Sequence, residues 1–304
     1  MAKYVVTGGA GFIGSHIADQ LIDRGDEVHV IDNFLTGKRE RVAAEAILHE
    51  TDIRDESKLE PIFRGAAGIF HVAAQPRMQY SISEPRLTND INITGTLNVL
   101  LAARDAGVPR VVYSASSSAY GPRHPTPLRE DMPPEPVIPY AIQKRVGEQY
   151  CHMAAEFYGL DTVSLRYFNV YGPRQTTSQD GPYATVIGIF LEERKNNRPM
   201  PVVPDGTQRR DFTHVRDVAL ANLLAMDAKS VGKGEIINVG TGVSHGVLEV
   251  AEMIGGPWKF VEPRQGEVKE TLADITQAKK LLGWEPKISF EEGIRELKKE
   301  YNLS

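Results

Sequence analysis

The sequence predicts an α/β fold, in which a doubly wound parallel sheet is joined to a smaller α/β domain. Short apolar runs alternate with helical patterns through the first half of the chain. This alternation requires crossover connections, which pair their strands in parallel. The apolar runs are rich in Val and Ile without polar alternation, as expected for strands with both faces covered. From about residue 167, Pro and Gly recur and the elements shorten, which indicates the second domain.

Six strands and four helices are predicted in the first domain. The strands are expected at residues 3–7, 27–31, 46–51, 68–72, 110–114 and 162–166, and the helices at 12–24, 56–63, 86–106 and 140–158. Seven prolines between residues 121 and 139 predict a loop there. The chain is expected to return to the sheet near 215–238. The first domain is therefore 1–166 plus about 215–238, and the second is 167–214 and 239–304.

The composition is that of an ordinary globular protein and excludes several function classes. Of the 304 residues, 41% are hydrophobic and 25% charged, and the net charge is -5 at pH 7. This balance argues against a general nucleic-acid or anionic-membrane surface. The single cysteine, Cys151, excludes an intrachain disulfide and fits a reducing cytoplasm. No apolar run approaches the ~18 residues of a membrane span, and no His, Cys and acid spacing suggests a metal site.

A glycine-rich turn follows the first strand and opens the first helix. Residues 7–14 read Thr-Gly-Gly-Ala-Gly-Phe-Ile-Gly and fit both Gly9-x-Gly11-x-x-Gly14 and Gly8-x-x-Gly11-x-x-Gly14. Glycines permit a tight turn and bring backbone N–H groups to a pyrophosphate at the helix N-terminus. Asp32 lies 18 residues after Gly14, where a carboxylate binds ribose hydroxyls. We therefore expect a Rossmann domain that binds NAD rather than NADP; the alternative is a nucleotide-binding turn without chemistry.

A Tyr–Lys pair and a serine cluster form the candidate chemical centre. Tyr140 and Lys144 are four residues apart, so they share one face of the predicted helix 140–158. A nearby ammonium and the helix N-terminus both favour a phenolate, so we expect the Tyr140 pKa to fall below its ordinary value of about 10. Residues 114–118, Ser-Ala-Ser-Ser-Ser, follow the fifth strand, at the edge where parallel sheets bind ligands. Their hydroxyls suit the orientation of an alcohol against the tyrosine; the alternatives are a chance helical pair and a polar turn.

Together these motifs resemble those of the extended short-chain dehydrogenase/reductases. The resemblance is carried by residues 7–14, Asp32, the serine cluster ending in Tyr120-Gly121, Tyr140 with Lys144, and residues 166–172, Arg-Tyr-Phe-Asn-Val-Tyr-Gly. It covers nearly the whole chain and points more narrowly to nucleotide-sugar 4-epimerases of the UDP-galactose 4-epimerase type. Related dehydratases and decarboxylases place a carboxylate in or just after the serine cluster, whereas this chain has Ser117, Ser118 and Ala119. The resemblance thus implies epimerisation at C4.

The resemblance also implies roles for individual residues. Ser116 matches the catalytic hydroxyl, Tyr140 the acid/base and Lys144 its partner. The implied NAD-binding residues are Gly8, Gly11, Phe12, Ile13, Gly14, Asp32, Asn33, Thr36, Gly37, Lys38, Asp52, Ile53, Val72, Ala73, Ala74, Gln75, Asn92, Ser114, Tyr140, Lys144 and Tyr167. The implied substrate-binding residues are Ser116, Ser117, Tyr140, Asn169, Arg174, Arg210, Arg264, Glu267 and Thr271.

The substrate implied by the resemblance is a UDP-hexose. Arginines such as Arg210 and Arg264 suit its diphosphate, because a guanidinium donates two parallel hydrogen bonds. Thr271 matches a position beside the hexose, where a small residue resembles enzymes that admit UDP-N-acetylhexosamines. The resemblance also implies a homodimer joined through the helices at 86–106 and 140–158. The alternatives are a UDP-glucuronate 4-epimerase, another nucleotide-sugar reductase or dehydratase of the superfamily, and a non-catalytic dinucleotide-binding protein.

One further motif predicts a different chemistry. Residues 242–246, Gly-Val-Ser-His-Gly, match the G-x-S-x-G nucleophile elbow of hydrolases. Such an enzyme needs an acid and then a histidine after the serine, but His245 is the last of the eight histidines. We therefore interpret Ser244 as part of a turn and helix cap.

Overall fold

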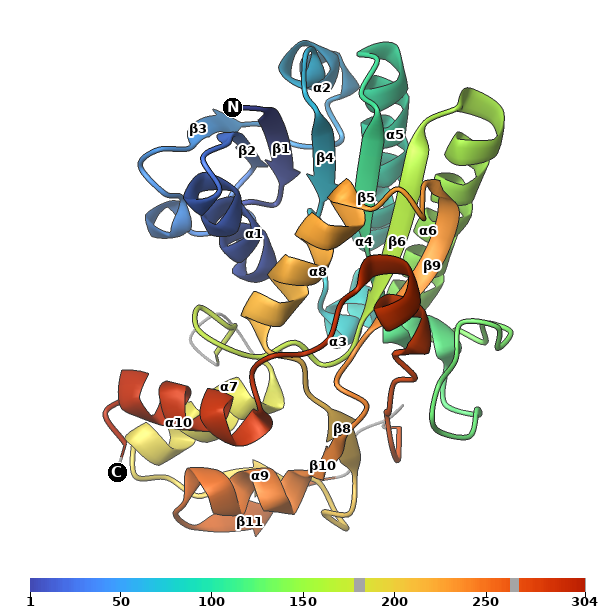
Figure 1. Cartoon of the computed structure of the whole chain (residues 1–304). Helices are drawn as coiled ribbons and strands as arrows, with labels where there is room; N and C mark the ends of the chain where they lie inside the picture. The colour runs from blue at the N-terminus through green and yellow to red at the C-terminus, as the bar shows by residue number, and fades with distance from the viewer. Residues whose placement is uncertain (178–183, 263–267, 304) are drawn as a thin grey trace.

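The computed structural model describes residues 1–177, 184–262 and 268–303 (Figure 1). Within these ranges, seven strands form one parallel sheet in the order β3-β2-β1-β4-β5-β6-β9. The strands are β1 (Lys3–Thr7), β2 (Glu27–Asp32), β3 (Ile47–Glu50), β4 (Gly68–His71), β5 (Arg110–Ser116), β6 (Asp161–Tyr167) and β9 (Lys233–Val239). The strand order reverses at β1, which is where a doubly wound sheet binds its ligand. The fold class predicted from the sequence is confirmed.

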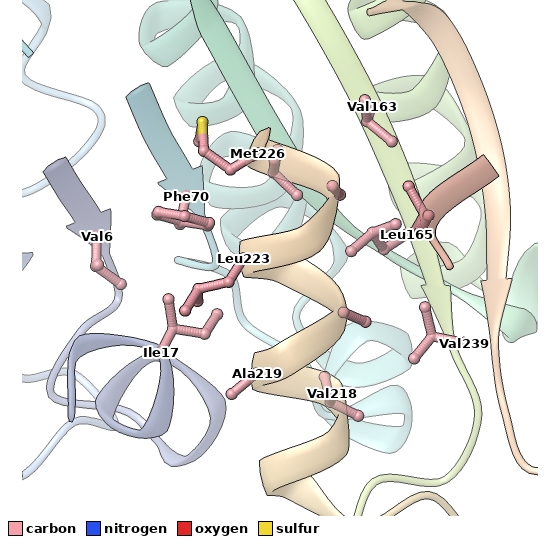
Figure 2. Packing of buried hydrophobic residues seen from close by; sticks show 14 of the residues in the cluster. Val6, Ile17, Phe70, Val163, Leu165, Val218, Ala219, Leu223, Met226 and Val239 are labelled. Carbon is pink, nitrogen blue, oxygen red and sulfur yellow. The ribbon is translucent and has the colours of Figure 1, made fainter. Parts of the chain in front are cut away.

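Helices cover both faces of this sheet. One face carries α1 (Phe12–Asp23) and α8 (Val215–Asp227), and the other carries α2 (Glu56–Phe63), α5 (Gly95–Asp105) and α6 (Pro139–Tyr158). Successive strand residues point to opposite faces, so Val6 packs in the first core and Val5 in the second. Figure 2 shows Leu223 of α8 facing Ile17 of α1 and Phe70 of β4. Inner strands such as β1 and β4 are buried on both faces and are mainly apolar without alternation, whereas the edge strand β3 is partly exposed.

The smaller region lies at the end of the sheet toward which β1 and β4 run (Figure 1). Its helices are α7 (Val186–Lys195), α9 (Val247–Ile254) and α10 (Phe290–Glu300). Strand β7 (Met200–Val202) pairs with β11 (Trp258–Phe260), and β8 (Arg209–Asp211) pairs with β10 (Ser244–Gly246). A separate core joins the three helices through side chains such as Phe190, Val250 and Ile294. This region therefore closes over the carboxyl ends of the strands.

The element predictions hold with three differences. The predicted helix at 86–106 is three pieces, namely α4 (Pro85–Asn89), a π-helical turn η2 (Asp90–Thr94) and α5. A helix that was not predicted, α3 (Met78–Ser83), precedes them. The serine cluster is divided, because Ser114 and Ser116 belong to β5 and a 3-10 turn η3 (Ser117–Tyr120) follows.

The remaining helical turns are η1 (Arg39–Arg41) and η5 (Ala278–Leu282). The chain rejoins the sheet through α8 and β9, and β9 pairs with β6 from Thr162↔Lys233 to Tyr167↔Val239. No helix in the described ranges is long and apolar enough to cross a membrane.

Candidate active site

A cavity of about 1000 Å³ lies along the carboxyl ends of the central strands and reaches into the smaller region. Its lining contains most of the residues predicted for the site. These are Gly8, Gly11, Phe12, Ile13, Gly14, Asp32, Asn33, Thr36, Asp52, Ile53, Val72, Ala73, Ala74, Ser114, Ser116, Ser117, Tyr140, Lys144, Tyr167, Asn169, Arg210 and Thr271. The cavity thus joins the glycine loop, the Tyr–Lys pair and the predicted substrate arginine in one space.

The glycine loop is packed so tightly that side chains cannot replace its hydrogens. Gly8 has φ +71, and a Cβ on it would lie 2.7 Å from the Ala73 backbone nitrogen. A Cβ on Gly14 would lie 2.2 Å from the Gly8 carbonyl oxygen. Gly11 is the N-cap of α1, so the free N–H groups of the first helical turn lie at this loop. Such a cradle fits a pyrophosphate.

Asp32 ends β2 beside this loop. Its carboxylate accepts hydrogen bonds from the Ala10 N–H (3.0 Å) and the Phe34 N–H (2.8 Å). Burial raises the pKa of Asp32, while these two backbone donors lower it. The side chain is thereby fixed at the cavity wall, where a ribose would lie. Glycine is required at position 37, since a Cβ there would lie 2.7 Å from the Asp32 carboxylate.

The next carboxylate along this wall is Asp52. The Asn33 side-chain amide donates to it at 2.7 Å, and Arg54 forms a hydrogen-bonded ion pair with it at 2.8 Å. The Arg54 hydrogen bond lowers the pKa of Asp52 to about 2. Asp52 is therefore ionised at neutral pH and held in place at the same end of the cavity as Asp32.

Gln75 and Asn92 are buried behind the groove and are not among the residues that line it. Asn92 accepts from the Gln75 backbone N–H at 2.7 Å, and its amide donates to the Gln75 carbonyl and to Gln143 of α6. It lies in the π-helical turn η2, a form of helix that is frequent at functional sites. Asn92 therefore supports the cavity lining at residues 72–74 by linking Gln75 to Gln143 of α6.

A second buried chain of hydrogen bonds supports the same wall. The Ala73 N–H donates to the Thr7 hydroxyl (3.3 Å), which lies 2.8 Å from His71 Nδ1. His71 Nε2 lies 3.0 Å from the Thr96 hydroxyl, which itself donates to the Asn92 carbonyl. The Thr96 hydroxyl proton is donated to that carbonyl, so His71 Nε2 must donate to the Thr96 oxygen. His71 Nδ1 must then accept from the Thr7 hydroxyl. Burial lowers the pKa of His71 to about 3, in agreement with a neutral ring.

The Tyr–Lys pair lies in the lining of the cavity. The Lys144 ammonium donates to the Ser114 carbonyl at 2.7 Å, and the Ser114 hydroxyl lies 3.0 Å from the Tyr167 hydroxyl. Tyr140 follows Pro139 at the start of α6, and its backbone N–H donates to the Ser81 hydroxyl of α3 at 3.1 Å. Residues from β5, β6, α3 and α6 therefore converge on one point.

The expectation of a lowered Tyr140 pKa is wrong for this structure. Burial raises the pKa of Tyr140 to about 12, and a hydrogen bond with Ser116 opposes that rise. Burial also lowers the pKa of Lys144 to about 8. The physical reason is that enclosure disfavours both charged forms, and the Lys144 ammonium is directed at the Ser114 carbonyl.

The substrate side of the cavity is formed by β6 and the smaller region. Asn169 has φ +26 and donates to the Thr271 hydroxyl (2.8 Å) and to the Asp211 carbonyl (3.0 Å). Buried Asp211 accepts from the N–H groups of three residues at 2.7–3.0 Å, Thr241, Gly242 and Ala273. These bonds fix Thr271 and neighbouring Arg210 at the cavity wall.

Other predicted site residues lie elsewhere. Arg174 forms an ion pair with Asp19 of α1 at 2.7 Å and is not among the lining residues. Gly37 and Lys38 are also not among the lining residues. Arg264 and Glu267 lie outside the described residues. The structure also adds lining residues that the sequence did not predict, including Arg41, Arg77, Met78, Gln79 and Glu270. Only the long-range folding of the chain brings these to the cavity, and no local motif marks them.

The hydrolase motif at 242–246 is structural. The Ser244 hydroxyl donates to Glu270 at 2.7 Å and accepts from Arg209 at 3.1 Å. His245 Nδ1 lies 2.8 Å from Glu249, and its ring stacks on Phe290. Among the described residues, the Ser244 hydroxyl is thus bonded to Glu270 and Arg209, and no histidine is its partner. Within the described part of the chain, no group of three or more His, Cys, Asp or Glu side chains could hold a metal ion.

Known proteins share this fold and sequence over nearly their full length. The UDP-glucose 4-epimerase of Thermotoga maritima, solved with UDP-glucose, is 39% identical, with a TM-score of 0.93 over 99% of this chain and 98% of that one. The UDP-N-acetylglucosamine 4-epimerase of Methanobrevibacter ruminantium, solved with UDP-N-acetylmuramic acid, is 36% identical, with a TM-score of 0.93 over 98% and 97%. The UDP-glucose 4-epimerase of Thermus thermophilus, solved with NAD, is 36% identical, with a TM-score of 0.91 over 99% of each chain.

The sequence profile of the NAD dependent epimerase/dehydratase family matches residues 4–240. The predicted cofactor and the predicted relationship are both confirmed, and the chain belongs to the NAD-dependent epimerase/dehydratase family.

Proposed function

We propose that the protein is a 4-epimerase of UDP-hexoses. The observation that carries this proposal is that Ser116, Tyr140 and Lys144 line the same cavity as the glycine loop and Arg210. A dinucleotide extended from the loop and a nucleotide sugar extended from the arginine would meet at the tyrosine. The names of the related epimerases support the same reaction.

The residues present fit NAD. The cradle at Gly8 and Gly14 suits the pyrophosphate, and the carboxylates of Asp32 and Asp52 suit the adenosine end. We assign NAD binding to residues 1–166 with about 215–238, and nucleotide-sugar binding to 167–214 and 239–304. NAD, when bound, accepts a hydride from C4 of the sugar and returns it.

Within this proposal, Tyr140 moves one proton out and back. The base is the Tyr140 phenolate, which is the minor form at a pKa of about 12. It takes the proton from the O4 hydroxyl as the C4 hydride leaves, which forms a 4-keto sugar. The phenol then returns the proton when hydride reaches the opposite face, so no net oxidation occurs. The hydrogen bond with Ser116 favours the phenolate, and the same hydroxyl orients O4. Lys144 contributes a positive charge below its pKa of about 8.

Two features bear on the choice of reaction and hexose. The turn η3 has Ser117, Ser118 and Ala119 where a dehydration would need a further proton-transfer group, and this favours epimerisation. Thr271 is small, so we infer that an N-acetyl group is accepted beside it. A UDP-glucuronate 4-epimerase is a second candidate, because Arg77 lines the cavity and a cation suits a uronate carboxylate.

We further propose that two chains form a homodimer through α4 with α5 and α6. The support is that Ile142 and Phe157 of α6 are exposed apolar side chains, with Phe157 73% exposed. Sedimentation or light scattering would test it, because a monomer at micromolar concentration would contradict the assignment.

The function is tested by a turnover panel. The purified protein is incubated with UDP-glucose, UDP-N-acetylglucosamine and UDP-glucuronate, and the products are separated by chromatography. We expect conversion of at least one into its C4 epimer, together with release of NAD when the protein is denatured. Tyr140→Phe should retain NAD and lose epimerisation by about two to four orders of magnitude. Full epimerisation by that variant contradicts the role of Tyr140, and NAD without turnover of any sugar favours a dinucleotide-binding protein.

A further inference from the structure

The serine of the hydrolase motif forms one half of a bridge through Glu270. The Ser244 hydroxyl donates to one carboxylate oxygen of Glu270 at 2.7 Å, and the Thr126 hydroxyl donates to the other at 2.9 Å. Arg209 lies 3.8 Å from the same carboxylate. Glu270 itself lines the cavity. Three hydrogen-bonding or charged groups from distant parts of the sequence thus meet on one side chain.

The backbone around Glu270 connects the same segments. Leu128 N–H donates to the Leu272 carbonyl at 2.7 Å, and Asp274 N–H donates to the Leu128 carbonyl at 2.9 Å. On the other side, Thr271 N–H donates to the Arg209 carbonyl at 3.1 Å. Residues 269–274 therefore lie between the loop at 121–139 and β8, with isolated β-bridges at Leu128↔Ala273 and Arg209↔Glu270.

The segments joined through Glu270 both contribute residues to the cavity lining. The loop at 121–139 directly follows the turn that contains Ser117, and its residues Pro122, His124 and Leu128 line the cavity. Strand β8 contributes Arg210 to the same lining. The distance between the chemical centre and the nucleotide-binding arginine hence depends on how the loop is attached to residues 269–274.

The chemistry of Glu270 fits attachment better than contact with substrate. A carboxylate facing a nucleotide diphosphate would repel it, but both oxygens of Glu270 accept hydrogen bonds from protein hydroxyls. The Ser244 hydrogen bond lowers the pKa of Glu270, so the side chain is ionised at neutral pH and the bonds are charge-assisted.

We propose that Glu270 is a positioning residue that sets substrate affinity by holding the loop at 121–139 against β8 and β10. The proposal rests on the proposed function, in that the ligand of the cavity is a nucleotide sugar. Truncation of Glu270 removes the hydrogen bonds from the Thr126 and Ser244 hydroxyls. The loop at 121–139 can then move away from β8 and β10. Productive binding then becomes rarer, while bound substrate still meets intact Tyr140, Ser116 and Lys144.

The kinetic test compares Glu270→Ala with Glu270→Gln. We expect Glu270→Ala to raise the KM for the UDP-sugar about tenfold, with kcat within about twofold of the parent protein, which is the split expected for lost binding. Glu270→Gln should recover most of the affinity, because its amide can accept from one hydroxyl and donate to the other. Thr126→Val combined with Glu270→Ala should be no worse than Glu270→Ala alone. A kcat loss at unchanged KM would overturn the proposal.

A second measurement does not depend on the substrate. Hydrogen exchange at the Leu128 and Asp274 amides should accelerate in Glu270→Ala and stay near the parent rate in Glu270→Gln and in Glu252→Ala, a control on the exposed side of α9. Unchanged exchange in Glu270→Ala overturns the proposal. Accelerated exchange in a protein that turns over no UDP-sugar supports the attachment and contradicts the proposed function instead.

Discussion

The Lys144 ammonium donates a hydrogen bond to the backbone carbonyl of Ser114 at 2.7 Å. This contact joins the first turns of α6 to the end of β5. It also directs the positive charge into the protein, where the Tyr113 ring lies 4.9 Å from the nitrogen. Burial therefore lowers the pKa of Lys144 to about 8, although the carbonyl contact partly compensates the ammonium for lost water.

The first prediction concerns stability against pH. Lys144 has a folded pKa of about 8, below its ordinary value of 10.5, so between these values the unfolded chain binds a proton that the folded chain lacks. Stability must then rise with pH through this window, by about 1.4 kcal/mol per pH unit at most. Urea unfolding midpoints should increase with pH in the parent protein relative to Lys144→Met. Lys144→Arg is the control, because arginine stays protonated throughout. If the urea unfolding midpoint depends on pH in the same way in all three proteins, the lowered pKa of Lys144 is contradicted.

The second prediction concerns the glycine loop. In Gly14→Ala the new Cβ meets the Gly8 carbonyl oxygen at 2.2 Å and the Gly8 carbonyl carbon at 2.8 Å, and these are backbone atoms that cannot rotate away. We expect the loop to shift and the affinity for NAD to fall at least about tenfold. The measurement is the NAD content of purified protein, followed by NAD titration.

Gly107→Ala is the matched control for this variant. Gly107 has φ +67 with open space around it, so alanine there costs about 1 kcal/mol of backbone strain. Its NAD content should equal that of the parent protein. If Gly14→Ala also retains full NAD, the tight packing of the loop is not what shapes the cofactor site.

The site was predictable from the sequence where local geometry determines it. The turn at 7–14 must follow a strand and open a helix, and Asp32 must end the next strand, so both positions follow from spacing. Tyr140 and Lys144 share a helix face for the same reason. Asp32, Tyr140 and Lys144 line the cavity, as do Gly8 and residues 11–14 of the turn.

Residues whose position depends on distant contacts were not predictable. Glu270 reaches the cavity only because residues 269–274 insert between β8 and a loop more than a hundred residues earlier. The π-helical turn at Asn92 is likewise set by bonds to Gln75 and Gln143, which helical periodicity does not contain. The prediction of a lowered Tyr140 pKa was wrong because burial of the side chain raises this pKa, and that burial depends on the whole fold.

The third prediction concerns a buried ion pair beneath the serine turn. Arg166 donates to both oxygens of Glu148 at 2.7 and 2.8 Å, and its guanidinium lies 4.4 Å from the centre of the Tyr120 ring. Glu148→Gln leaves the arginine charge buried without its counter-charge, which costs about 3 kcal/mol. Denaturant unfolding measures this loss. The double variant Glu148→Leu with Arg166→Met should recover part of it, because the buried Arg166 charge is then removed as well, although Arg145, which also donates to Glu148 at 3.0 Å, loses its partner. A neutral effect of Glu148→Gln would mean that the pair contributes little.

The last prediction concerns hexose size. Thr271 lines the cavity, and its hydroxyl accepts from the Asn169 amide at 2.8 Å. In Thr271→Tyr, a large side chain replaces a small one and fills the space that we propose for the N-acetyl group of the hexose. If the proposed substrate orientation is right, kcat/KM for UDP-N-acetylglucosamine should fall at least about tenfold more than kcat/KM for UDP-glucose. Thr271→Ser keeps the hydroxyl and the small volume, so it should leave that ratio unchanged. An equal loss for both substrates in Thr271→Tyr would place the hexose elsewhere in the cavity and would assign Thr271 to support of Asn169 alone.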